Sequence, residues 1–111
     1  MKTLFSKIID RELPADIQFE NEHLIVIKDI NPTAPVHLLI IPKKVYPDLQ
    51  SIPVEELGIL QEIVKTAQLL AKQHHLEEGY RLLTNNGSLA GQTIFHLHFH
   101  LIGGRPLGAL G

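Results

Sequence analysis

The stretch Ile94-Phe95-His96-Leu97-His98-Phe99-His100-Leu101-Ile102 alternates large apolar residues with histidine. Alternate residues of a β-strand point to the same face, so a strand over 94–102 would place its three histidines in one row. The residues Leu97, Phe99 and Leu101 would then form the opposite face and enter the core. A helix would scatter the histidines around its axis, and the aromatic and branched neighbours also favour a strand.

The rest of the chain predicts an α+β domain around this strand. Thr3 is a suitable cap for a short helix from Leu4 to about Asp10, which Leu13-Pro14 ends. Apolar residues at helical spacing predict one long helix from about Pro53 to His75, with Ser51 as its cap. Four further strands are predicted from β-rich runs bounded by turn residues, at Ile17–Glu20, His23–Lys28, His37–Pro42 and Tyr80–Asn85. We therefore expect a single domain over residues 1–111, with about five largely antiparallel strands and one long helix packed on a face.

Composition restricts the classes of function. The chain has 111 residues, a net charge of −2 and no cysteine. The charge argues against holding a nucleic-acid backbone by bulk electrostatics, but it leaves room for a single nucleotide in a pocket. The lack of cysteine excludes disulfides, thiolate zinc sites and cysteine nucleophiles. We expect no secretory signal and no membrane span, since Lys7, Asp10 and Arg11 interrupt the start of the chain and the longest apolar stretch, Val36–Pro42, is short. A cytoplasmic protein is the expectation.

A row of three imidazoles is a poor structural choice, because each buried ring needs hydrogen-bond partners. Two functional interpretations compete with a third, in which the three histidines lie by chance on a solvent-exposed face of the strand. Histidines at alternate strand positions can converge on zinc, or one imidazole can attack phosphorus while its neighbours stabilise charge. A zinc hydrolase usually needs a nearby carboxylate, and the chain has no acid from Arg81 to its C-terminus.

The loop before the histidines suits an anion better than a cation. Gly87 and Gly91 let backbone N–H groups turn toward a phosphate, and Ser88, Gln92 and Thr93 add neutral donors. The alternative for this loop is a plain hairpin connection, because Asn86-Gly87 is a common hairpin turn. Of the remaining histidines, His37 is a candidate beside the row, whereas His23, His74 and His75 are assigned no function.

The motif from Gly91 to Ile102 resembles the one that defines the histidine triad (HIT) family, and Gly103-Gly104-Arg105 resembles its Hint branch, the adenosine phosphoramidases. The resemblance extends over nearly the whole chain, through Phe5–Ile9, the turn around Asp29–Pro35, and His37–Lys43. It implies a HIT-like α+β homodimer in which the long helices pack together and the sheets join into one. It also implies hydrolysis of purine nucleoside phosphoramidates and aminoacyl adenylates to a nucleoside monophosphate such as AMP and an amine, without a metal or other cofactor.

Carried over by position, the resemblance makes His98 the nucleophile, with His96, His100 and His37 completing the catalytic histidines. His100, Gln92 and Thr93 would hold the α-phosphate, with Asn85 beside it, and Asp29 would accept from the ribose hydroxyls. The purine would lie among Phe5, Ile8, Ile27 and Leu39. Two departures concern specificity: Val45 stands where many relatives carry a histidine, and the C-terminus lacks the Trp of animal relatives.

Three alternatives remain at this point. A diadenosine polyphosphate hydrolase of the Fhit-like branch would use the same histidines, although Gly103-Gly104-Arg105 speaks against it. A metal-binding interaction module would use the row as a zinc site without turnover. A regulatory nucleotide sensor would keep the pocket and act through a protein partner.

Overall fold

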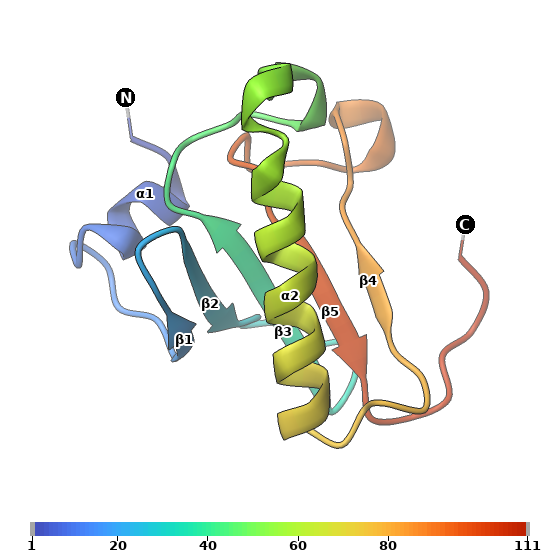
Figure 1. Cartoon of the computed structure of the whole chain (residues 1–111). Helices are drawn as coiled ribbons and strands as arrows, with labels where there is room; N and C mark the ends of the chain where they lie inside the picture. Colours follow the sequence, from blue (N-terminus) through green and yellow to red (C-terminus); the bar gives the residue numbers. More distant parts are fainter. Residues whose placement is uncertain (1, 111) are drawn as a thin grey trace.

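The computed structural model describes residues 2–110, which form a five-stranded antiparallel sheet with one helix on each face (Figure 1). The order in the sheet is β1-β2-β3-β5-β4. The strands are β1 (Ile17–Glu20), β2 (Leu24–Lys28), β3 (Val36–Pro42), β4 (Arg81–Leu83) and β5 (Phe99–Gly103). The helices are α1 (Leu4–Ile9) and α2 (Gly58–Gln73). The predicted α+β class, the antiparallel sheet and the single long helix are confirmed.

Alternation along the central strands sends their side chains to two separate cores. On one face, α2 packs Ile63, Ala67 and Leu70 against residues of the sheet, namely Leu24, Val26, Leu38, Ile40 and Leu101. On the other face, α1 packs Phe5 and Ile8 against Ile25, Ile27, Leu39 and Ile41. Because α1 is only 6 residues long, it covers β2 and β3 but not the whole of this face. The uncovered part lies beside β5 and forms the floor of the site described below.

The long helix begins later than predicted. Pro53 to Glu56 do not enter it: Val54–Glu56 form a 3₁₀ turn, and α2 begins at Gly58. The predicted cap Ser51 instead ends another short 3₁₀ turn, over Leu49–Ser51, which Asp48 caps. The apolar stripe itself begins at Leu57, and the earlier start was predicted from Ser51 and Pro53, which fit a 3₁₀ turn as well as the first turn of an α-helix.

The last strand is shorter than predicted. It begins at Phe99 rather than at Ile94, so His96 and His98 precede the sheet and His100 lies within it. The strand Tyr80–Asn85 likewise shortens to Arg81–Leu83. The two strands do pair antiparallel, as the Asn-Gly signal predicts, but a longer connection containing the 3₁₀ turn Ser88–Ala90 joins them.

We expect His75→Gly to stabilise the protein. His75 follows the C-cap of α2 with φ of 59°, in the left-handed region that glycine adopts without a steric penalty. The substitution should raise the free energy of unfolding by about 1 kcal/mol, measured by urea denaturation. The matched control Gln73→Gly, inside the last turn of α2, should lower it by a similar amount. A less stable His75→Gly variant would contradict this assignment.

Candidate active site

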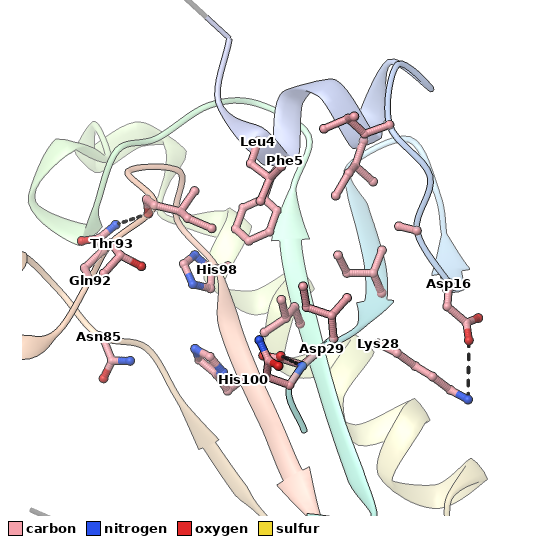
Figure 2. A pocket seen from close by; sticks show the side chains of 18 of the residues that line it. Leu4, Phe5, Asp16, Lys28, Asp29, Asn85, Gln92, Thr93, His98 and His100 are labelled. Carbon is pink, nitrogen blue, oxygen red and sulfur yellow. Dashed lines mark hydrogen bonds and ion pairs between the residues drawn. The ribbon is translucent and has the colours of Figure 1, made fainter. Parts of the chain in front are cut away.

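A cavity of about 750 Å³ opens between α1, the ends of β2 and β3, and the chain leading into β5 (Figure 2). Its volume lies in the range typical of small-molecule sites. The lining includes eleven of the residues that the sequence singles out: Phe5, Ile8, Ile27, Asp29, Leu39, Asn85, Gly91, Gln92, Thr93, His98 and His100. Figure 2 shows the rings of His98 and His100 with Asn85 on one side and Phe5 and Asp29 on the other.

One half of the cavity is apolar and leads to a carboxylate. Phe5 and Ile8 from α1 face Ile27 and Leu39 from the sheet, and all four are buried. Asp29 follows directly after β2, where its backbone N–H donates to the carbonyl of His37 (3.0 Å) and its Oδ1 accepts from the N–H of Asn31 (2.8 Å). An apolar slot that ends at a fixed carboxylate suits a ring system carrying hydroxyl groups.

His98 is held with one nitrogen bound and the other directed to the cavity. Its Nδ1 lies 2.8 Å from the backbone carbonyl of His96. A carbonyl only accepts, so Nδ1 carries the proton and Nε2 is unprotonated in the neutral ring. Phe5 packs edge-on against this ring, with 4.9 Å between centroids. Burial lowers the pKa of His98 from its usual value, so the ring is neutral and its Nε2 lone pair is free to act as a nucleophile.

His100 and His37 form a second, directly bonded pair. His100 pairs with Leu39 across β3 and β5, which places it diagonally beside His37 on the same face. His37 Nε2 and His100 Nδ1 lie 2.8 Å apart, and His37 Nε2 is also 3.3 Å from Asp29 Oδ2. Burial, followed by the neighbouring His98 and His37, lowers the pKa of His100 to about 4. His37 does not line the large cavity, and it reaches the site only through His100.

His96, which the resemblance counts among the catalytic histidines, is fully buried and does not line the cavity. Its Nε2 donates to the carbonyl of Pro42 (2.7 Å), and its Nδ1 bonds to Thr3 Oγ1 (2.7 Å), the hydroxyl that also caps α1. The expected row of three imidazoles is present, because Phe5 packs against both His96 and His98 (5.8 and 4.9 Å between centroids) and His98 packs against His100 (5.3 Å). Of the three rings, those of His98 and His100 line the cavity. His96 fastens α1 to the segment that carries His98.

The loop before β5 contributes less side-chain polarity to the cavity than predicted. Ser88 is exposed and does not line it. Gln92 is buried, and its amide nitrogen donates to the carbonyls of Pro47 (2.7 Å) and Ile94 (3.0 Å), while its Oε1 accepts from Gly87 N–H (2.8 Å). Its side chain therefore shapes the loop rather than offering a free donor. Asn85, Gly91 and Thr93 remain at the cavity, and φ of 91° at Gly91 explains the glycine there.

The sequence reasoning missed a second group of lining residues. It comprises Leu4, Leu13, Pro14, Ala15, Asp16, Lys28, Ile30, Asn31 and Ile94. Four of them, Leu13, Pro14, Ala15 and Asp16, belong to the connection between α1 and β1, which the sequence marks only as the end of a helix. Asp16 and Lys28 form an ion pair (3.6 Å) at the rim, visible in Figure 2. Their approach depends on how β1 and β2 pair, so no local signal could have found them.

Asp29, His37 and His100 together offer three metal-ligand atoms within 4.8 Å of one another. The hydrogen bonds of His37 disfavour this use. The backbone N–H of Thr33 lies 3.1 Å from His37 Nδ1 and donates to it. A neutral His37 must then carry its proton on Nε2, the atom that would have to bind the metal. The pair is thus arranged for a hydrogen bond between the rings.

The depressed histidine pKa values predict how stability depends on pH. Protonating the rings of His96, His98 and His100 is harder in the folded protein than in the unfolded chain. The stability they contribute is therefore fully present above the unfolded pKa of 6.5 and is lost as the pH falls toward about 4. We expect thermal unfolding to give a nearly constant Tm above about pH 7 and a falling one below 6.5. The fall should be shallower in His100→Gln, and an equal fall in both proteins would contradict the assignment.

Within residues 2–110, no helix combines the length and the apolar character that crossing a membrane requires.

Comparison with known proteins identifies the family. The HIT domain matches residues 10–107. A HIT-like protein of Chlamydia pneumoniae is 52% identical over 97% of this chain and 98% of its own length. The purine nucleoside phosphoramidase of Escherichia coli is 41% identical over 98% of this chain and 92% of its own. A HIT family hydrolase from Legionella pneumophila superposes with a TM-score of 0.93 at 41% identity, over 96% of both chains. The chain therefore belongs to the HIT family, which includes the hydrolases to which it is similar.

Proposed function

We propose that this protein is a purine nucleoside phosphoramidase that forms a nucleotidyl-His98 intermediate. The observation that carries the proposal is the unprotonated Nε2 of His98 at the cavity, fixed by the bond from its Nδ1–H to the carbonyl of His96. The similarity to the phosphoramidase of Escherichia coli supports the same activity. A neutral imidazole needs no base to activate it, unlike a hydroxyl nucleophile.

The proposed reaction has two displacements at phosphorus. In the first, the Nε2 lone pair of His98 forms an N–P bond and the P–N bond to the amine breaks. The amine leaves with that electron pair and takes up a proton. In the second, water attacks phosphorus, the bond to His98 breaks, and the water gives up a proton to leave a nucleoside monophosphate. Donors at Thr93, Gly91, Asn85 and His100 stabilise charge on the phosphoryl oxygens.

The nucleoside would occupy the other half of the cavity. We place the purine between Phe5 and Ile8 of α1 and Ile27 and Leu39 of the sheet, with Asp29 accepting from the ribose hydroxyls. This arrangement puts the α-phosphate beside His98 and His100, and it leaves the amine toward the open side of the cavity.

The experiment that tests this function is release of AMP from adenosine 5′-phosphoramidate, with diadenosine polyphosphate as the competing substrate and with and without a chelator. Chelator-resistant release from the phosphoramidate at the higher kcat/KM supports the proposal. Preference for the dinucleotide would favour the hydrolase of the Fhit-like branch. Turnover that the chelator abolishes would favour a metal site.

Asp29→Asn is expected to remove discrimination between ribose and 2′-deoxyribose substrates. The asparagine carbonyl can still accept from Asn31 N–H, so the turn is kept while the charge is lost. Hydrogen bonds to charged groups contribute about 1.5–3 kcal/mol, so KM for the ribose substrate should rise at least tenfold. Steady-state kinetics on the paired substrates measure this change. If the variant still prefers the ribose substrate by the wild-type ratio, Asp29 does not bind the ribose.

We also propose that the protein works as a homodimer in the cytoplasm. Two features of the described residues support a dimer. β4 lies at the edge of the sheet, where another strand can pair, and Val64 and Leu69 of α2 are 45% and 42% exposed. The absence of cysteine is in keeping with a reducing compartment.

A further inference from the structure

The chemistry of His100 depends on a single proton shared with His37. A hydrogen bond of 2.8 Å between His37 Nε2 and His100 Nδ1 requires one of the two atoms to carry the proton. If His37 carries it, His100 is protonated on Nε2 and presents a donor to the cavity. If His100 carries it on Nδ1, the unprotonated Nε2 of His100 presents a lone pair to the cavity, and this lone pair repels a phosphoryl oxygen. The two arrangements have opposite consequences for an anionic ligand.

The backbone N–H of Thr33 selects between these arrangements. It lies 3.1 Å from His37 Nδ1, closer than Thr33 Oγ1 at 3.4 Å. A peptide N–H only donates, so His37 Nδ1 must be unprotonated and accept this bond, and His37 Nε2 must carry the proton. Asp29 Oδ2, at 3.3 Å from the same Nε2, also favours a proton there. His100 is thereby left with its proton on Nε2.

Thr33 lies in an exposed turn between β2 and β3, and the segment that follows β5 braces this turn. Arg105 Nη2 donates to the carbonyl of Thr33 (2.7 Å), and Arg105 Nη1 donates to the carbonyl of Pro106 (2.8 Å). Gly104 has φ of 97°, and a Cβ added there would lie 3.0 Å from Pro35 Cβ. Figure 1 shows the β2–β3 turn and the start of the C-terminal tail at the same end of the sheet. The β2–β3 turn is therefore held from outside the cavity, by the close approach of Gly104 to Pro35 and by the hydrogen bond from the Arg105 guanidinium to Thr33.

We propose that Arg105 is a positioning residue that, by holding the Thr33 backbone, fixes the His37–His100 pair in the arrangement that presents His100 Nε2–H to the cavity. Arg105 does not line the cavity, so its effect passes through Thr33 and His37. The tautomers follow from the hydrogen bonds alone, whereas their consequence for turnover rests on the proposed function.

The kinetic test compares three variants on adenosine 5′-phosphoramidate. Arg105→Ala should lower kcat by about three- to tenfold, the loss expected for one hydrogen bond, with KM nearly unchanged. Arg105→Lys, which keeps a cationic donor, should recover most of the kcat. Arg81→Ala is the matched control, since Arg81 also ties the tail through a backbone carbonyl, that of Gly108 (2.7 Å), but does not touch the turn. Equal losses in Arg105→Ala and Arg81→Ala would overturn the proposal.

The direct test is ¹⁵N NMR of the histidine side chains in the free, full-length protein. In the wild type, His37 and His100 should both be protonated on Nε2, while His98 should be protonated on Nδ1. In Arg105→Ala, a second His100 tautomer should appear, and in Arg81→Ala it should not. A wild-type His100 protonated on Nδ1, or an unchanged His100 in Arg105→Ala, would overturn the proposal. This measurement needs no substrate, so it decides the proposal even if the phosphoramidase assay fails.

Discussion

His98→Ala is expected to abolish turnover of adenosine 5′-phosphoramidate while leaving AMP binding within a fewfold of the wild type. The imidazole is the proposed nucleophile, so its removal blocks the first displacement. Loss of a covalent nucleophile commonly lowers kcat by about 10⁴-fold or more. The proposed nucleoside contacts come from α1 and the central strands rather than from His98, although one of them, Phe5, packs edge-on against the deleted ring. Steady-state release of AMP and calorimetric titration with AMP measure the two quantities.

The matched variant for this prediction is His98→Asn. The asparagine amide can still donate to the carbonyl of His96, which His98 Nδ1 reaches at 2.8 Å, so the backbone is held while no nucleophile faces phosphorus. It should be as inactive as His98→Ala and as stable as the wild type. Turnover by either variant within tenfold of the wild type would remove His98 from the role of nucleophile.

His100→Ala is expected to lower kcat by about 10²- to 10³-fold with a smaller change in KM, the range found for losing a donor to a developing oxyanion. His100 lies 5.3 Å from His98 between ring centroids, so both rings can reach one phosphoryl group. The neutral ring, whose pKa is about 4, acts here as a hydrogen-bond donor through Nε2. Single-turnover kinetics isolate the chemical step.

His100→Gln provides the control, because a glutamine amide nitrogen can occupy a position close to that of His Nε2 and donate the same bond. It should recover part of the rate lost in His100→Ala. If the two variants are equally slow, the Nε2–H donor is not what His100 contributes. If His100→Ala retains nearly all activity, the phosphoryl group does not contact this side of the cavity.

The features that sequence reasoning predicted correctly are encoded by short local patterns. Apolar, β-rich runs bounded by turn residues located β2 and β3, and the helical stripe located α2. The resemblance to the family placed His98 and His100 in one site with four apolar residues, because it covers the segments that supply them. These four are Phe5, Ile8, Ile27 and Leu39. The start of α2 was misplaced, since Pro53 precedes a 3₁₀ turn over Val54–Glu56 rather than opening the α-helix.

Two differences in the site come from contacts that the local pattern does not encode. Alternation places His96 on the same face as His98 and His100, but it does not show that Thr3 and Pro42 bind both ring nitrogens of His96 outside the cavity. Gln92 was expected to face an anion, yet its amide bonds to Pro47, a residue distant in the sequence. Such long-range partners for polar side chains leave no mark in the local pattern.

The stereochemical course at phosphorus tests the central claim most directly. One diastereomer of an adenosine 5′-phosphorothioamidate would be hydrolysed in ¹⁸O-enriched water, and the configuration of the isotopically labelled product determined. Each in-line displacement inverts phosphorus, so attack by His98 followed by attack by water predicts net retention. Net inversion would mean that water displaces the amine in a single step, and it would contradict a nucleotidyl-His98 intermediate.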